Sequence, residues 1–238
     1  MRLDVALVAQ NIYPTRARAL AAVRAGLVTV NGVVAKKAAM PVSDSDVLCG
    51  GALPYSVGRG SLKLKRALES FHINPGGMRC LDIGASTGGF TSVLLSRGAT
   101  HILAVDVGTN QLASELRTDA RVTSMEQTDI RSLAPVAPVD LIVIDVSFIS
   151  LADIAPVLSR WGAKNIIALI KPQFEVPRNI AAKTGGVIRS EKWRAYAIER
   201  ATAAMRTNGF ELQDVISSPI RGGSGNEEFL AHFVPVSA

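Results

Sequence analysis

From residue 79 onward, apolar runs of strand length alternate with amphipathic stretches of helix length. The expected strands are 79–84, 101–107, 121–127, 139–146, 165–171, 210–220 and 227–235. Helices are expected at 88–98, 110–117, 151–161 and 190–208. Because alternating strands and helices form a parallel sheet with helices on both faces, the pattern predicts an α/β fold. The last two strands are joined by a loop, so we expect them to pair as an antiparallel hairpin at the sheet edge.

The first fifty residues follow a different pattern. Apolar positions recur at helical spacing in two stretches, with Thr15 placed to cap the second helix and Gly26 to end it. Two β-rich runs then flank Asn31-Gly32, a pair typical of a hairpin turn. A Gly- and Pro-rich stretch at 49–60 is typical of a linker, and a basic amphipathic helix is predicted at 61–73. We therefore expect two domains, 1–60 and 61–238.

The net charge of +6 is concentrated near the start of the chain. Residues 1–75 hold ten basic and four acidic residues, whereas residues 76–238 hold sixteen of each. This asymmetry favours contact with a polyanion such as nucleic acid over a merely solvated face. The candidate RNA contacts are Arg2, Arg16, Arg18, Arg24, Lys36, Lys37, Lys65 and Arg66.

The remaining features of the sequence argue against a membrane protein, a secreted protein and a metal-binding protein. No apolar run reaches the length of a membrane span, and the first residues do not form a signal peptide, so a soluble cytoplasmic protein is expected. Cys49 and Cys80 are predicted to be buried free thiols in a reducing compartment. Neither cysteine has a histidine at metal-ligand spacing, and we expect no metal site.

The stretch LDIGASTGGF at 81–90 is a strand, a glycine turn and a helix start. Such a turn lets the backbone approach a ligand, and an acid about twenty residues on, here Asp106, is placed to hold a ribose. The order differs from the dinucleotide motif, and Asp82 suits a cofactor with a positive charge, such as S-adenosylmethionine. A tight turn with no ligand is the alternative. The candidate cofactor contacts are Asp82, Gly84, Ser86, Thr87, Gly88, Gly89, Asp106, Asp129 and Asp145.

Two charged residues, Asp145 and Lys171, end strands that are otherwise almost wholly apolar. The carboxyl ends of parallel strands are where open α/β sheets bind ligands, so a site is favoured over a structural ion pair. A lysine there can stabilise the charge that develops on a ribose 2′-hydroxyl, while the aspartate orients it. No cysteine follows a proline, so carbon methylation through a cysteine adduct lacks its nucleophile.

Several sequence segments, in the order in which they occur along the chain, resemble the TlyA family of ribosomal RNA 2′-O-methyltransferases, often named haemolysins. The segments that carry the resemblance are AGLVTVNG, LDIGASTGGFT, VIDVSFISL, LIKPQFE, GGVIR and GNEEFL. The resemblance implies a Rossmann-like class I methyltransferase with a seven-stranded, mostly parallel sheet after a small α+β S4 RNA-binding domain. It implies a Lys-Asp-Lys-Glu tetrad at Lys63, Asp145, Lys171 and Glu228, with S-adenosylmethionine as cofactor and cytidine in rRNA as substrate.

The residues by themselves leave parts of this assignment open. An RNA-facing or solvated helix face explains Lys63 equally well, and strand alternation allows only one of Glu227 and Glu228 to face inward. The linker SVGRGS and the stretch after KPQFE depart from the family pattern. Shorter members of the family are linked to 23S rRNA alone and longer ones to both subunits, so at this length the resemblance implies 23S rather than 16S rRNA. A ribosomal RNA or subunit is the expected partner, with no stable protein partner; a catalytically inactive rRNA-binding protein and a haemolysin are the alternatives.

Overall fold

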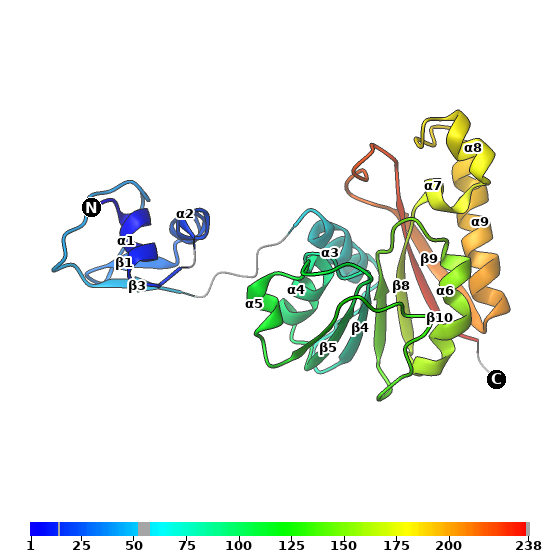
Figure 1. Ribbon diagram of the computed structural model, residues 1–238, viewed down its shortest axis with the longest axis horizontal. Coiled ribbons are helices and arrows are strands. Elements are labelled where there is room, and N and C mark those ends of the chain that lie inside the picture. The colour runs from blue at the N-terminus through cyan, green and yellow to red at the C-terminus, as the bar shows by residue number, and fades with distance from the viewer. Residues whose placement is uncertain (14, 52–57, 237–238) are drawn as a thin grey trace. The chain divides into compact units, whose positions relative to one another are not determined.

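The computed structural model describes residues 1–13, 15–51 and 58–236, and the chain divides into two compact units, Met1–Ser56 and Val57–Ala238 (Figure 1). The smaller unit holds two helices, α1 (Leu3–Ala9) and α2 (Arg16–Arg24). Its antiparallel sheet has the order β2-β1-β3, with bounds Val33–Val34, Val28–Val30 and Leu48–Gly50.

The local signals predicted for the smaller unit are confirmed. The Thr15 hydroxyl accepts a hydrogen bond from the Arg18 backbone N–H at 3.3 Å, which caps α2. Gly26 follows α2 with φ +71°, a left-handed conformation that favours glycine. Asn31 and Gly32 both have positive φ, as the turn between two hairpin strands requires.

Strand β3 corrects two predictions at the start of the expected linker. Cys49 and Gly50 belong to β3, which pairs with β1 along one edge of the sheet. Leu48 packs against the core, and the alternation of side chains along a strand then turns Cys49 outward, where it is exposed. The prediction that Cys49 is buried is therefore wrong. Cys80 is buried as predicted, and burial raises the pKa of its thiol to about 12.

The larger unit is built on a seven-stranded sheet of order β6-β5-β4-β7-β8-β10-β9. The bounds are β4 Arg79–Ile83, β5 His101–Val105, β6 Val122–Met125, β7 Leu141–Ile144, β8 Asn165–Ile170, β9 Phe210–Ser217 and β10 Phe229–Pro235. Five strands are parallel, and β10 is antiparallel to both β8 and β9, which confirms the predicted hairpin at the edge. The chain changes direction of travel across the sheet between β4 and β7, so the carboxyl ends of these strands open a crevice.

Helices cover both faces of this sheet. The bounds are α3 Gly60–Ser70, α4 Gly89–Ser96, α5 Ser114–Arg117, α6 Leu151–Leu158, α7 Pro172–Glu175, α8 Arg178–Lys183 and α9 Glu191–Thr207, with a 3-10 turn at Ser159–Trp161. Helix α3 packs on α4 on one face of the sheet, and α6 packs on α9 on the other face (Figure 1). The two short helices α7 and α8 were not expected from the sequence. No described helix is long and apolar enough to cross a bilayer.

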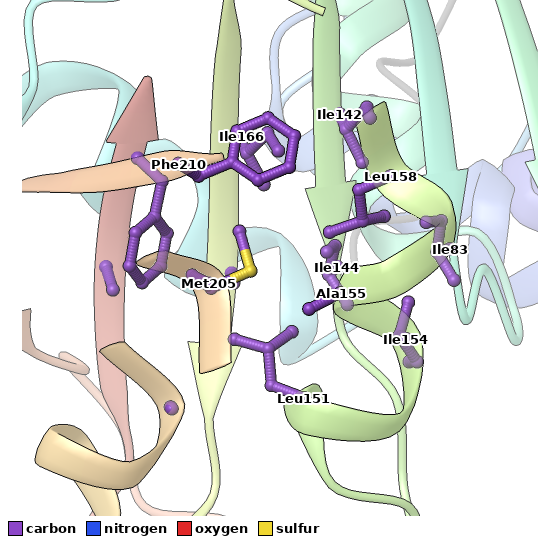
Figure 2. Close-up of a cluster of buried hydrophobic side chains, with 14 of the residues drawn as sticks. Ile83, Ile142, Ile144, Leu151, Ile154, Ala155, Leu158, Ile166, Met205 and Phe210 are labelled. Atoms are coloured by element: carbon purple, nitrogen blue, oxygen red, sulfur yellow. The ribbon is translucent and has the colours of Figure 1, made fainter. Parts of the chain in front are cut away.

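The main core lies between the sheet and helices α6 and α9. Figure 2 shows Ile142 and Ile144 of β7 facing Leu158 of α6, with Met205 and Phe210 closing the other end. Strands β7 and β8 are buried almost from end to end, as their unbroken apolar runs predict. Rigid, buried strands of this kind hold the residues that follow them at fixed positions.

Candidate active site

Four charged side chains from four elements meet at the carboxyl edge of the sheet. Lys63 comes from α3, Asp145 follows β7, Lys171 follows β8, and Glu228 precedes β10. The Lys171 Nζ lies 2.6 Å from Asp145 Oδ1, and the Lys63 Nζ lies 2.7 Å from Glu228 Oε2. Asp145 Oδ2 is 3.8 Å from Lys63 Nζ, which joins the two pairs into one cluster, the tetrad.

The tetrad is largely withdrawn from water. Lys63 and Lys171 are each 8% exposed, and Glu228 is 2% exposed. Buried charges are costly unless they are paired, and two cations with two carboxylates leave the cluster neutral. The parallel pairing of β7 with β8 brings Asp145 and Lys171 together, as their positions at strand ends predict.

The structure also decides the two positions that the sequence left open. Lys63 lies on the face of α3 that buries Leu64 and Ala67, so it points toward the sheet and not into solvent. Glu228 faces inward, whereas Glu227 forms an ion pair with Arg194 at 2.7 Å.

Two residues at the tetrad were not expected. The Lys171 Nζ donates to the Ser147 hydroxyl at 2.9 Å, so Ser147 and Asp145 together hold this ammonium group. A Cβ on Gly222 would lie 2.3 Å from Glu228 Oε1, so only glycine leaves room for the carboxylate. Ser147 could have been predicted from its position two residues after the aspartate that ends the strand. No local sequence feature predicted the role of Gly222.

The glycine turn packs tightly against the strand that ends in Asp145. Gly84 has φ +83°, and a Cβ there would lie 2.5 Å from the Asp145 carbonyl oxygen. Gly88 begins α4 with φ +95°, and a Cβ would overlap Leu116. These two glycines are thus required by the packing of the turn.

Asp82 is fully buried behind this turn and lines neither of the two cavities described below. Its Oδ2 accepts the Thr91 hydroxyl at 2.6 Å, which ties the strand to α4, and its Oδ1 has no partner among the described residues. Burial raises the pKa of the Asp82 carboxyl to about 7, against the lowering effect of the Thr91 hydrogen bond and with some help from the charge of Asp145.

Two cavities of opposite charge meet at Asp145. The tetrad cavity, of about 830 Å³, has four basic and two acidic side chains among its described lining residues: Arg59, Lys63, Lys171 and Arg221, with Asp145 and Glu228. The acidic cavity, of about 710 Å³, has four acidic side chains and one basic: Asp106, Asp129, Asp145 and Asp153, with Arg131. Gly84, Ser86, Asp145, Ser147 and Phe148 line both.

The predicted cofactor contacts divide between these cavities. Asp106 lines the acidic cavity and accepts hydrogen bonds from the backbone N–H groups of Ser86 and Gly108, at 2.8 and 2.7 Å. Asp129 lines it too, in an ion pair with Arg131 at 2.6 Å. Thr87 and Gly89 line the tetrad cavity, and Gly88 lines neither.

The predicted RNA contacts lie on both units. Arg2 and Arg16 each form an ion pair of 2.9 Å with Asp4, yet their side chains are 54% and 61% exposed. Arg24, Lys36, Lys37 and Arg66 are exposed, and Arg18 and Lys65 are half-buried. The structure therefore leaves most of the positive charge that was predicted to meet a polyanion accessible to solvent.

This sheet order, with its crevice at the carboxyl ends, defines the class I methyltransferase fold. A putative S-adenosylmethionine-dependent methyltransferase from Listeria monocytogenes has it, with a TM-score of 0.57 and 13% identity over 75% of this chain and 99% of that one. The FtsJ-like methyltransferase family matches residues 56–234, and the S4 domain matches residues 1–48. The chain belongs to the TlyA family, an FtsJ-like methyltransferase preceded by an S4 domain.

Several relatives are similar over almost the whole chain. The 16S/23S rRNA (cytidine-2′-O)-methyltransferase TlyA of Mycobacterium tuberculosis is 43% identical over 96% of this chain and 87% of that protein. Hemolysin A of Brachyspira hyodysenteriae is 39% identical over 98% of this chain and 100% of that protein. The solved structure of a putative hemolysin from Streptococcus thermophilus is 41% identical, with a TM-score of 0.74, over 100% of this chain and 89% of that one.

Proposed function

We propose that this enzyme transfers a methyl group from S-adenosylmethionine to the ribose 2′-hydroxyl of a cytidine in ribosomal RNA. The observation that carries the proposal is the neutral, buried tetrad on the wall of a cavity whose remaining charge is positive. The mycobacterial relative is named for this reaction on 16S and 23S rRNA, and a Campylobacter jejuni relative, 40% identical over 75% of this chain, is named for 23S alone. We propose 23S rRNA as the substrate, as for the Campylobacter jejuni relative, and the cytoplasm as the compartment in which the enzyme acts.

The acidic cavity fits the cofactor. S-adenosylmethionine has a sulfonium and an α-amino group, and the described walls of this cavity carry a net charge of −3. Asp106 would hold the ribose, Asp129 the adenine amino group, and Gly84 and Ser86 the methionine end. When bound, the cofactor supplies an electrophilic methyl group.

The tetrad prepares the hydroxyl that accepts this methyl group. Asp145 and Ser147 take two of the three N–H donors of Lys171, so the third is available for the substrate. A hydrogen bond from it to the 2′-oxygen stabilises the negative charge that develops while this oxygen bonds the methyl carbon and loses its proton to solvent water. Lys63, which Glu228 holds in place, lies 3.8 Å from the other oxygen of Asp145 and so helps to fix the direction in which Lys171 points.

The smaller unit is proposed to recruit the RNA, with the boundary of the methyltransferase domain near residue 60. This part of the proposal has the support of the excess positive charge in the first 75 residues and of the match to the S4 domain. The candidate contacts there are Arg2, Arg16, Arg18, Arg24, Lys36 and Lys37, with Lys65 and Arg66 on the larger unit.

The test is methyl transfer from labelled S-adenosylmethionine to purified 16S and 23S rRNA, with the modified nucleotide mapped afterwards. Lys171→Ala and Glu228→Gln should lower the rate constant at saturating substrates by at least about a hundredfold. Glu227→Gln is the matched control, because it removes the neighbouring carboxylate that pairs with Arg194, and should keep the wild-type rate. Transfer by Lys171→Ala at the wild-type rate, or no transfer to any rRNA by the wild type, would refute the proposal.

A further inference from the structure

Arg59 and Arg221 form a second constellation at the tetrad cavity. Arg59 lies just before α3, and Arg221 lies in the loop between β9 and β10, 162 residues away. The Arg59 Nη2 donates to the Arg221 carbonyl oxygen at 2.9 Å, and the Arg221 Nη1 donates to the Gly225 carbonyl oxygen at 3.1 Å. Both side chains are exposed and line the cavity. We infer that the two guanidinium groups bind a phosphodiester of the RNA beside the ribose that is methylated, an inference that rests on the proposed function.

The charge of the tetrad cavity favours an anionic ligand. The tetrad is neutral, so the net charge of +2 on the described walls comes from Arg59 and Arg221. Among the described residues, neither arginine lies within ion-pair distance of a carboxylate, and both are anchored through backbone carbonyl groups. An anion entering this cavity therefore meets two cations whose charge no described residue neutralises.

The two arginines are held in place by the protein itself, without a ligand. The loop that carries Arg221 is closed by hydrogen bonds from Gly222 N–H to the Asn226 carbonyl and from Gly225 N–H to the Gly222 carbonyl, both 2.9 Å. The Asn226 side chain is buried and bonds Ile188 N–H at 2.8 Å and the Gly186 carbonyl at 2.7 Å. A fixed site binds with less loss of conformational entropy.

The chemistry of RNA supplies an anion next to the hydroxyl that is methylated. In RNA the 2′-hydroxyl and the 3′-phosphate sit on adjacent carbons of one ribose, so the substrate brings a phosphodiester wherever it brings its hydroxyl. Each guanidinium uses one of its five N–H donors on a carbonyl, which leaves a planar fork suited to phosphate oxygens. The lysines of the tetrad are engaged with carboxylates and cannot neutralise this charge.

A carboxylate is the competing anion, because S-adenosylmethionine carries one. The two sources are separated by measuring each ligand alone. Arg59→Gln and Arg221→Gln should each raise the dissociation constant for a short single-stranded RNA about tenfold. Each variant should also lower, by about 0.7, the slope of the logarithm of this constant against the logarithm of the salt concentration. The dissociation constant for S-adenosylmethionine should stay the same. Arg59→Lys should recover part of the loss, since it keeps the charge but not the fork.

Arg206→Gln is the matched control. It removes one exposed positive charge from the last turn of α9, away from both cavities. The inference is overturned if RNA affinity and salt slope do not change in the two cavity variants, if Arg206→Gln changes them equally, or if the cofactor constant changes instead. Binding is measured without catalysis, so a wild type that fails to methylate rRNA would refute the proposed function, whereas the binding data would still decide on the arginines.

Discussion

The buried carboxyl of Asp82 makes stability depend on pH in a direction that can be worked out. Its pKa is about 7 in the folded protein, against 3.8 as its ordinary value. Between these values the folded state keeps a proton that the unfolded chain has already released. The stability that this carboxyl contributes is therefore fully present below pH 3.8 and is lost as pH rises through 7. A shift of about 3 pKa units corresponds to about 4 kcal/mol of unfolding free energy lost between these values.

The substitution Asp82→Asn removes this titration. Above pH 7 the variant avoids the loss of about 4 kcal/mol but leaves an amide N–H group buried without a partner, which costs about 1–3 kcal/mol, so a net gain of about 1–3 kcal/mol is expected. Below pH 4 the variant should be the less stable protein. Urea unfolding followed by tryptophan fluorescence is a suitable assay, because both tryptophans, Trp161 and Trp193, lie in the larger unit. A difference between variant and wild type that stays constant from pH 4 to pH 8 would refute this reasoning.

Three further substitutions test other contacts. Gly222→Ala places a Cβ 2.3 Å from the Glu228 carboxylate and should lower the rate constant of methyl transfer at least about tenfold, with little change in melting temperature; an unchanged rate would count against the tetrad. Glu175→Ala removes a 2%-exposed carboxylate that accepts two hydrogen bonds at the start of α6 and should cost about 1–3 kcal/mol in urea unfolding, whereas Glu175→Gln should keep most of the stability. Asp4→Asn breaks the ion pairs with Arg2 and Arg16 that hold the pKa of Asp4 well below its usual range. These pairs contribute stability that is present above the pKa of the unfolded chain and is lost as pH falls through the pKa of the folded protein, so the variant should lack this stability at pH 7. Faster amide exchange in α1 of the variant at pH 7 would show the loss, and equal exchange in both proteins would contradict it.

Half of the tetrad could be predicted from the sequence by simple physics. Asp145 and Lys171 each end an apolar strand, and parallel neighbours bring their ends together. Lys63 and Glu228 could not be predicted in this way. A lysine on a basic helix, and one of two adjacent glutamates, have many equivalent solvent-exposed explanations, and only the resemblance to the family selected them. The structure supplies the reason, since each residue is the partner of the other.

The elements that were missed are short or stabilised by distant contacts. Helices α7 and α8 contain four and six residues, too few for a periodic pattern to be recognised. Strand β3 lies at the start of a Gly-rich stretch and forms because it hydrogen-bonds to β1. The residues of β3 alone do not predict this pairing. The pairing of Arg59 with the loop at Arg221 likewise depends on residues far apart in the chain.

The contact between Lys63 and Glu228 also bears on how the enzyme becomes active during synthesis. It joins positions 165 residues apart, and β10 must pair between β8 and β9 before Glu228 reaches its place. Contacts of such long sequence separation form late, because the entropy of closing the intervening chain must first be overcome. A nascent chain that ends before residue 228 already contains the strands that line the acidic cavity, yet it lacks one member of the tetrad. Under the proposed function, catalysis therefore requires that the last hairpin has been synthesised and has docked on β8.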